Sequence, residues 1–138
     1  MGLLPEGSLI ANTSGRFQCR WVDLVRTASD SPYLDGLPAR FPLPIAHAEG
    51  RFVAPAGRAA EYRERGWVAL TYAEDVNGSQ ERIAAVQDDT RRVFGLMPHP
   101  ERFLLPRHHP DAGWSQPAWG LQFFHSIHQR LRAARAPA

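Results

Sequence analysis

Apolar residues in extended patterns fill most of the first hundred positions and predict a strand-rich chain. In the segment 17–25 (FQCRWVDLV), apolar and polar residues alternate through Phe17, Cys19 and Trp21, which is the period of a strand with one buried face. Other segments that favour strands by apolar, β-branched or aromatic content are 8–11, 43–53, 67–72, 82–86 and 92–97, of which 43–53 has a polar break at residues 47–50. The stretch 27–42 is rich in Pro, Gly, Ser and Asp and is expected to be a loop.

Two segments have helical character instead. Residues 56–65 can form one short amphipathic helix that Gly66 closes. From Pro117 onward, apolar residues recur at helical spacing and predict a long closing helix with one apolar stripe. The members of this stripe are Leu121, Phe124, Ile127 and Leu131. Asn77-Gly78, a strong turn dipeptide, is expected to join the strands 67–72 and 82–86.

Length and composition restrict the fold class and the cellular setting. The chain has 138 residues, 43% of them hydrophobic, which is the size and composition of one globular domain. Cys19 is the only cysteine, so an intramolecular disulfide and a cysteine-based metal site are excluded, and a reducing, cytoplasmic setting is expected. A run of eighteen apolar residues does not occur, so we expect no membrane-spanning helix.

The positive charge does not indicate a nucleic-acid binder. The net charge is +2, and all 16 basic residues are arginine. A phosphate-binding surface usually contains some lysine as well, and no stripe of clustered arginine and aromatic residues accompanies the charge. We therefore expect no nucleic-acid partner.

The segment 97–102 (MPHPER) follows an apolar strand and holds the most reactive combination of residues. Pro100 restricts His99 to extended backbone, because the proline ring crowds the residue before it. Glu101 lies two residues on, a spacing that places both side chains on one side of an extended chain. The carboxylate can then hold one ring nitrogen of His99 and leave the other free as a base, as in nucleophile–His–acid triads. The alternative is a surface turn without a catalytic role.

This segment also carries a resemblance, together with RFQCRWVDL, LPIAHAEGRF, NGSQERIAAV and the closing WGLQFFHSI. In this order the motifs are similar to the C-terminal half of the glutaminase component of phosphoribosylformylglycinamidine synthase, over essentially the whole chain. That family belongs to the class I, triad-type glutamine amidotransferases. The resemblance implies an α/β, flavodoxin-like fold, of which residues 1–138 are a partial domain: the strand-rich C-terminal half with its closing helix.

The resemblance implies roles for particular residues. In the family, the histidine and glutamate of the PHPE segment complete a Cys-His-Glu triad. His99 is thereby implied as general base and acid, and Glu101 as the residue that orients it. The loop at His47, Ala48 and Glu49 is similar to the loop that holds the substrate, L-glutamine, by backbone groups. The implied reaction is the hydrolysis of glutamine to glutamate and ammonia.

Partners and cofactors follow from the same resemblance. The ammonia would pass to an ATP-using synthetase that makes formylglycinamidine ribonucleotide in purine biosynthesis. The implied partners are this large synthetase subunit and a small bridging subunit of the same complex. ATP and Mg would be used by the synthetase, and we expect no cofactor and no metal in this chain, which lacks a Gly-rich phosphate-binding signature.

The chain departs from the family pattern at three points. The nucleophilic cysteine of the family precedes the segment similar to residues 2–7 (GLLPEG), so we expect a nucleophile-bearing N-terminal part upstream, encoded with this chain or on a separate polypeptide. Cys19 lies in the middle of a predicted strand, and we expect it to be a buried packing residue rather than a nucleophile. Ala48 stands where the family has glycine, which narrows the loop if the position requires a positive φ.

Other histidines are weaker candidates. His108 and His109 are adjacent, so their side chains point apart, and we expect a solvated loop rather than a metal site. His125 and His128 are expected to be ordinary helix residues. Two alternatives to a glutaminase stay open: a non-catalytic interaction subunit, and a truncated gene product without glutaminase activity.

Overall fold

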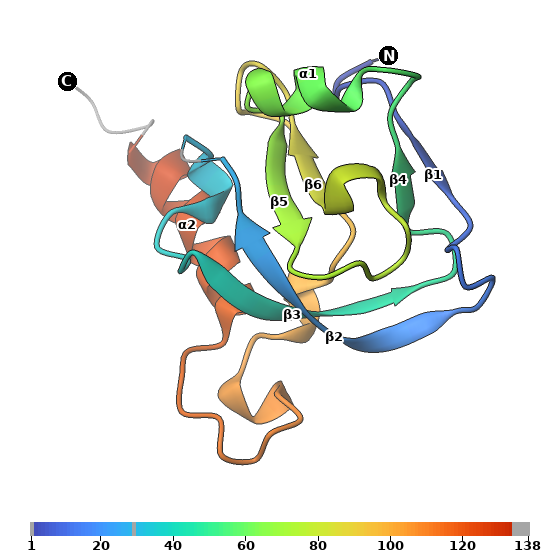
Figure 1. Ribbon diagram of the computed structural model, residues 1–138. Helices are drawn as coiled ribbons and strands as arrows, with labels where there is room; N and C mark the ends of the chain where they lie inside the picture. The colour runs from blue at the N-terminus through green and yellow to red at the C-terminus, as the bar shows by residue number, and fades with distance from the viewer. Residues whose placement is uncertain (1, 29, 134–138) are drawn as a thin grey trace.

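The computed structural model describes residues 2–28 and 30–133. Within these ranges the strands are β1 (Ser8–Ile10), β2 (Gln18–Arg26), β3 (Arg40–His47), β4 (Arg51–Val53), β5 (Val68–Tyr72), β6 (Ile83–Gln87) and β7 (Phe94–Leu96), and the α-helices are α1 (Ala59–Glu64) and α2 (Trp119–Ala133). Five strands form a sheet in the order β3-β2-β5-β6-β7, and β1 pairs with β4 in a separate two-stranded sheet (Figure 1). The pairings are antiparallel throughout the described part of the chain.

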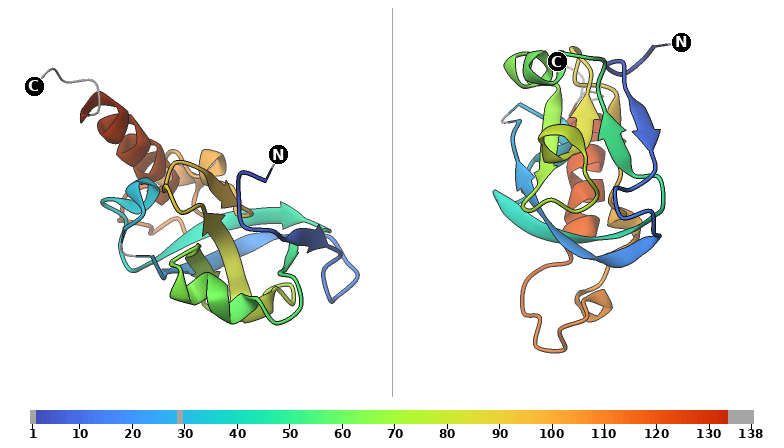
Figure 2. Two further views of the ribbon diagram at one scale, coloured as in Figure 1. Left: turned by 90° about the horizontal axis from the view of Figure 1, so that it is seen from above. Right: turned by 45° about the vertical axis from the view of Figure 1, so that its right-hand side comes forward.

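The larger sheet is curled, so that the segment after β7 reaches the outer edge of β3 (Figure 2). At this point the backbone N–H of His99 donates to the carbonyl oxygen of Pro44 over 2.8 Å. The carbonyl of Pro44 therefore points away from β2, and so does its nitrogen. Pro42 and Pro44 lack an N–H. The loss is tolerated because β3 is an edge strand and the nitrogens of these prolines lie on its side away from β2. The curl brings two segments far apart in the sequence to one place.

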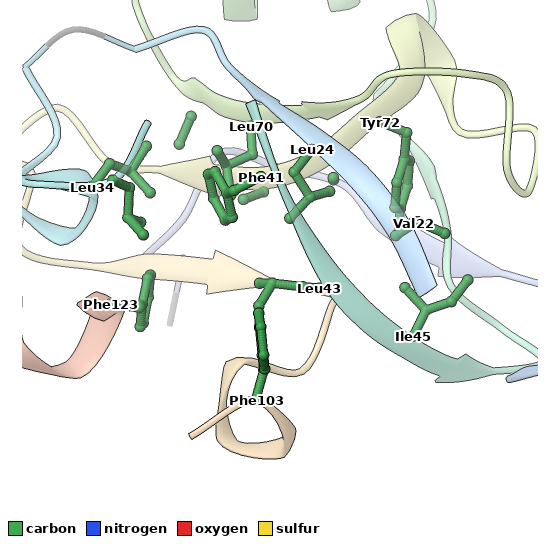
Figure 3. Packing of buried hydrophobic residues seen from close by; sticks show 14 of the residues in the cluster. Val22, Leu24, Leu34, Phe41, Leu43, Ile45, Leu70, Tyr72, Phe103 and Phe123 are labelled. Carbon is green, nitrogen blue, oxygen red and sulfur yellow. The ribbon is translucent and has the colours of Figure 1, made fainter. Parts of the chain in front are cut away.

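The strands β5 and β6 are buried on both faces, and each face has its own apolar cluster. The larger cluster contains Leu24, Leu43 and Leu70 of the sheet together with Phe103 and Phe123, and Figure 3 shows Leu43 beside Phe103. The smaller cluster lies under α1 and β4. It contains Phe52, Ala54, Tyr62, Trp67, Val68, Ile83 and Val86. Because both faces are covered, these strands appear in the sequence as continuous apolar runs instead of alternating ones.

The outer ends of the predicted strands are confirmed within one to three residues, and the predicted short helix is α1. The segment 43–53 forms two strands, β3 and β4, which are separated at its polar break and belong to different sheets. Gly66 follows α1 with φ +65°, a conformation that glycine adopts without strain. The connection from β5 to β6 differs from the prediction. Gly78 has the positive φ of a turn residue, but the connection spans residues 73–82 and includes the short 3₁₀ turn Gln80–Arg82. The side chain of Asn77 in this connection is buried.

The long closing helix is confirmed as α2, but the prediction of its buried face is wrong in part. Leu121, Phe124 and Leu131 are exposed, whereas Gly120, Phe123 and Ser126 are buried. Ile127, the fourth residue of the predicted stripe, is half-buried and packs against the core with Phe123. Gly120 and Ser126 are buried because the helix approaches other backbone closely there, and hydrophobicity alone does not reveal such positions. In the described ranges, no helix has the length and apolar character needed to cross a membrane.

The first turn of α2 fixes the segment that follows β7. The N–H of Leu121 donates to the carbonyl oxygen of Phe103 over 3.1 Å. A Cβ atom at Gly120 would lie 1.9 Å from the carbonyl oxygen of Pro100 and 2.5 Å from that of Phe103. Glycine is therefore required here for the helix to reach the 3₁₀ turn Pro100–Arg102.

We predict that Gly120→Ala destabilises the chain by at least about 2 kcal/mol, because an overpacked backbone contact must open. The free energy of unfolding, measured with urea, checks the change. Gly113→Ala is the matched control, since Gly113 is exposed and the added Cβ meets only the side chain of Asp111, at 3.3 Å. Equal stability of Gly120→Ala and Gly113→Ala would contradict the close approach of α2.

Candidate active site

The backbone of His99 is held firmly on both sides. The flanking Pro98 and Pro100 are buried, and the N–H of His99 is bonded to Pro44. His99 has φ −106° and ψ 89°, outside the helical region, as the proline after it predicts. The imidazole therefore starts from a fixed point at the junction of β3 and the segment after β7.

Glu101 holds one nitrogen of this imidazole. Nδ1 of His99 lies 2.6 Å from Oε1 of Glu101, and because a carboxylate only accepts, Nδ1–H is the donor. The predicted contact is thus present, but the reason given for it is wrong. Glu101 lies in the 3₁₀ turn Pro100–Arg102 and not in an extended chain, so the turn, which α2 supports, brings the two side chains together.

The second nitrogen of His99 remains available as a base. Nε2 is buried and makes no hydrogen bond within the described residues. Because Nδ1 donates to Glu101, the neutral imidazole carries its lone pair on Nε2. An oriented imidazole with one free nitrogen is the form in which histidine acts as a general base toward a thiol or a water molecule.

The second predicted segment, residues 47–49, continues through Gly50 and connects β3 to β4; residues 47–50 are called the 47–50 loop below. His47 is the last residue of β3 and is buried, whereas Ala48 and Glu49 are exposed. Ala48 does not have the positive φ that would strain a substitute for glycine; the non-glycine residues with positive φ in the described ranges are Glu81, Arg82 and Arg91. The strain considered for Ala48 is therefore not present.

The surroundings of His47 favour its neutral form. Its Nδ1 lies 3.0 Å from Oδ1 of Asn12. Burial lowers the pKa of His47 below its ordinary value of 6.5; its own backbone hydrogen bond opposes the change, and the charge of His99 lowers the pKa further. The influence of His99 is consistent with the curl of the sheet, because His99 is bonded to Pro44, three residues before His47.

Two open grooves flank β7. His99 and Glu101 line one groove of about 430 Å³ together with apolar side chains of β7 and α2, Phe94, Leu96, Phe123 and Ile127 among them. The other groove, of about 330 Å³, lies toward the N-terminal segment, with Leu4, Leu9 and Phe52 in its lining. The residues of β7 are half-buried, although β7 is an edge strand in the described part of the chain.

The other cysteine and histidine candidates lie outside the two candidate segments, and most of them are exposed. Cys19 is exposed on β2, so the expectation that it is buried is wrong, because its strand position faces away from the core. His108 is exposed, but His109 stacks on Trp114 with ring centroids 4.0 Å apart, which corrects the prediction of a fully solvated pair. His125 and His128 are exposed on α2. Among the described residues, no group of three potential metal ligands is present.

Sequence reasoning missed Asn12. This buried side chain bonds to both ends of the 47–50 loop, yet in the sequence it belongs to an ordinary Asn-Thr-Ser-Gly turn. A polar turn residue is expected to be solvated. Only the pairing of β1 with β4, which brings Asn12 against the loop, shows its position.

The fold agrees with comparisons with known proteins. Residues 4–129 match the CobB/CobQ-like glutamine amidotransferase domain. This match covers most of the chain, which therefore belongs to the glutamine amidotransferase family.

Curated relatives and a solved structure define the branch of the family. The phosphoribosylformylglycinamidine synthase subunit PurQ of Thermotoga maritima is 45% identical over 104 residues, 74% of this chain and 45% of that protein. PurQ of a Synechococcus species is 38% identical over 133 residues, 94% of this chain and 56% of its own length. A chain in the solved structure of PurLQS from Thermotoga maritima has a TM-score of 0.77 at 39% identity, covering 95% of this chain and 55% of the other.

The resemblance found in the sequence motifs and the α/β amidotransferase fold are thus confirmed. The chain spans about half the length of the curated relatives that it matches.

We predict that stability falls as the pH decreases through 6.5. Since the folded-state pKa of His47 is below its unfolded value, the unfolded chain binds the additional proton, and stability increases with pH in this range. One proton contributes at most about 1.4 kcal/mol per pH unit. Urea unfolding at pH 7.5, 6.5 and 5.5 measures the change in unfolding free energy with pH. Asp30 titrates below this range, because the hydrogen bond from Arg91 lowers its pKa.

Two variants show which histidine causes this pH dependence of stability. His47→Gln should flatten it, and His108→Gln, at an exposed position, should leave it as in the wild type. An unchanged slope in His47→Gln would show that His47 is not the group responsible.

Proposed function

We propose that this chain is the C-terminal half of a PurQ-type glutamine amidotransferase, which hydrolyses L-glutamine to glutamate and ammonia. The observation that carries the proposal is the 2.6 Å contact between His99 and Glu101, with Nε2 of His99 buried and free. A surface turn gives no reason to orient a histidine by a carboxylate, two buried prolines and a backbone hydrogen bond. The similarity to PurQ proteins supports the same assignment.

His99 transfers protons in both halves of this reaction. Nε2 accepts the proton of a cysteine thiol, and the thiolate attacks the carboxamide carbon of glutamine. The imidazolium then gives its proton to the departing nitrogen, so that ammonia leaves and a thioester forms. In the second half, Nε2 takes a proton from water, the hydroxide attacks the thioester, and the thiol is restored with glutamate as product.

Glu101 acts through His99. Its carboxylate holds Nδ1–H, which fixes the ring orientation and stabilises the imidazolium that forms in each half of the reaction. The loop at Ala48 and Glu49 is proposed to hold glutamine by backbone groups, as the resemblance implies. It follows β3, the strand to which His99 is bonded.

The thiol is proposed to come from the N-terminal half of the amidotransferase domain, which lies outside these 138 residues. Edge strand β7 supports this arrangement, because its residues are half-buried and apolar grooves lie on either side of it. A strand with apolar contacts on both faces is typical of the interior of an α/β sheet. Burying the two grooves would place the added half beside His99.

Ammonia made here is proposed to pass to a synthetase that forms formylglycinamidine ribonucleotide. A PurLQS structure from Thermotoga maritima contains a chain with this fold, which supports assembly with synthetase and bridging subunits. ATP and Mg would then be used by the synthetase, with no cofactor on this chain. The reaction class that consumes the product is an ATP-dependent amidation.

The test is glutaminase activity of the reconstituted amidotransferase, defined as this chain co-expressed with a polypeptide that supplies the N-terminal half. Ammonia release from glutamine should appear in the soluble complex. His99→Ala should lower the rate by about 1,000-fold, because a positioned general base contributes about that factor. Glu101→Ala should lower it less, since the base remains.

Two further variants serve as controls. His108→Ala and Cys19→Ser lie at exposed positions and should keep the wild-type rate. The chain without its partner half should release ammonia no faster than buffer. A soluble complex without turnover, or wild-type turnover in His99→Ala, would contradict the proposed function.

A further inference from the structure

The 47–50 loop is held by two buried asparagines that come from separate connections. Asn12 follows β1, and Asn77 lies between β5 and β6. Asn12 is 3% exposed and Asn77 is 1% exposed. A buried carboxamide is costly unless its donors and acceptors are bonded, so the bonds of these two side chains define how the loop is fixed.

Asn12 bonds to three of the four loop residues. Its Nδ2 donates to the carbonyl oxygen of His47 over 2.9 Å, and its backbone N–H donates to the carbonyl oxygen of Ala48 over 2.8 Å. Its Oδ1 accepts from Nδ1 of His47 over 3.0 Å and from the N–H of Gly50 over 3.3 Å. One side chain thus fixes the peptide groups on either side of Ala48 and Glu49.

Asn77 fixes the far end of the loop. Its Nδ2 donates to the carbonyl oxygen of Gly50 over 2.8 Å. Its own backbone carbonyl accepts from the N–H of Thr13, next to Asn12, over 3.1 Å. Gly50 is also packed against the ring of His47, because a Cβ there would lie 2.4 Å from Nδ1. The two asparagines and the loop therefore form one interlocked unit.

The hydrogen bonds of the two asparagines leave two backbone donors of the loop without a partner. The N–H groups of Ala48 and Glu49 make no hydrogen bond within the described ranges, and both residues are exposed. Two adjacent N–H donors on a backbone that is fixed at both ends suit an acceptor such as a carboxylate or a carboxamide oxygen. Their direction depends on the peptide groups that Asn12 holds.

We propose that Asn12 is a positioning residue for substrate binding: it sets the orientation of the Ala48 and Glu49 N–H groups toward glutamine without contacting the substrate. This inference rests on the proposed function, because it assigns the loop to glutamine. Fixing a binding loop before the substrate arrives improves affinity, since no ordering of the loop remains to be done on binding. The effect of Asn12 therefore appears in KM and not in the chemical step at His99.

The test uses the reconstituted amidotransferase and separates KM for glutamine from kcat. Asn12→Ala removes the three side-chain bonds to the loop and should raise KM at least 10-fold, while kcat stays within about 3-fold of the wild type. Asn12→Asp keeps an oxygen that can accept from Gly50 and His47 but loses the donor to the His47 carbonyl. Asn12→Asp should give a KM between those of the wild type and Asn12→Ala. It tests the proposal if Asn12→Ala does not form the complex.

Gln87→Ala is the matched control. Gln87 is also a fully buried carboxamide that donates to a backbone carbonyl, that of Gly66, but it lies at the end of β6 near the turn after α1. Its loss should lower stability and leave KM unchanged. An unchanged KM in a folded Asn12 variant, or an equal rise in Gln87→Ala, would overturn the positioning role. Absence of turnover in the wild-type complex would instead contradict the proposed function.

Discussion

The hydrogen bond from the N–H of His99 to the carbonyl oxygen of Pro44 joins the two ends of the curled sheet. One bond of this kind contributes only about 1 kcal/mol, so its importance is geometric. The free energy that holds the curl comes from the apolar side chains beneath it, of which each large one contributes about 1.5–3 kcal/mol on burial. Packing of these side chains brings β3 close to the segment after β7, and the hydrogen bond between them fixes the backbone of His99.

From this junction the other features of the site follow in order. The chain leaves His99 through Pro100 into a 3₁₀ turn, which places Glu101 against the imidazole. Helix α2 holds the turn through the close approach at Gly120. On the other side of the junction, β3 continues to His47 and the loop that Asn12 fixes. The backbone of both candidate segments is thus fixed, while Nε2 of His99 and the N–H groups of Ala48 and Glu49 have no partner among the described residues.

The strands and the contact between His99 and Glu101 could be predicted from the sequence, whereas part of the buried face of α2 and the role of Asn12 could not. The strands were predictable because runs of apolar, β-branched and aromatic residues fit the pleated, buried surface of a sheet. The contact between His99 and Glu101 was predictable from spacing, although the turn that makes it was not. Part of the buried face of α2 was missed because Gly120 lies against the backbone of Pro100 and the hydroxyl of Ser126 donates to the carbonyl of Asp35. An apolar stripe does not reveal such contacts. Asn12 was missed because its partners are about 35 residues away.

The most direct test of the junction as an assembly site is backbone hydrogen exchange at β7, the edge strand that leads into His99. In this chain alone, the N–H groups of Phe94–Leu96 that point away from β6 should exchange rapidly, because they lie at a sheet edge. On addition of the N-terminal half, their exchange should slow by at least about 100-fold as a neighbouring strand pairs with them. Rapid exchange at these positions in a stable, stoichiometric complex would contradict the proposal that β7 and His99 are completed by that half.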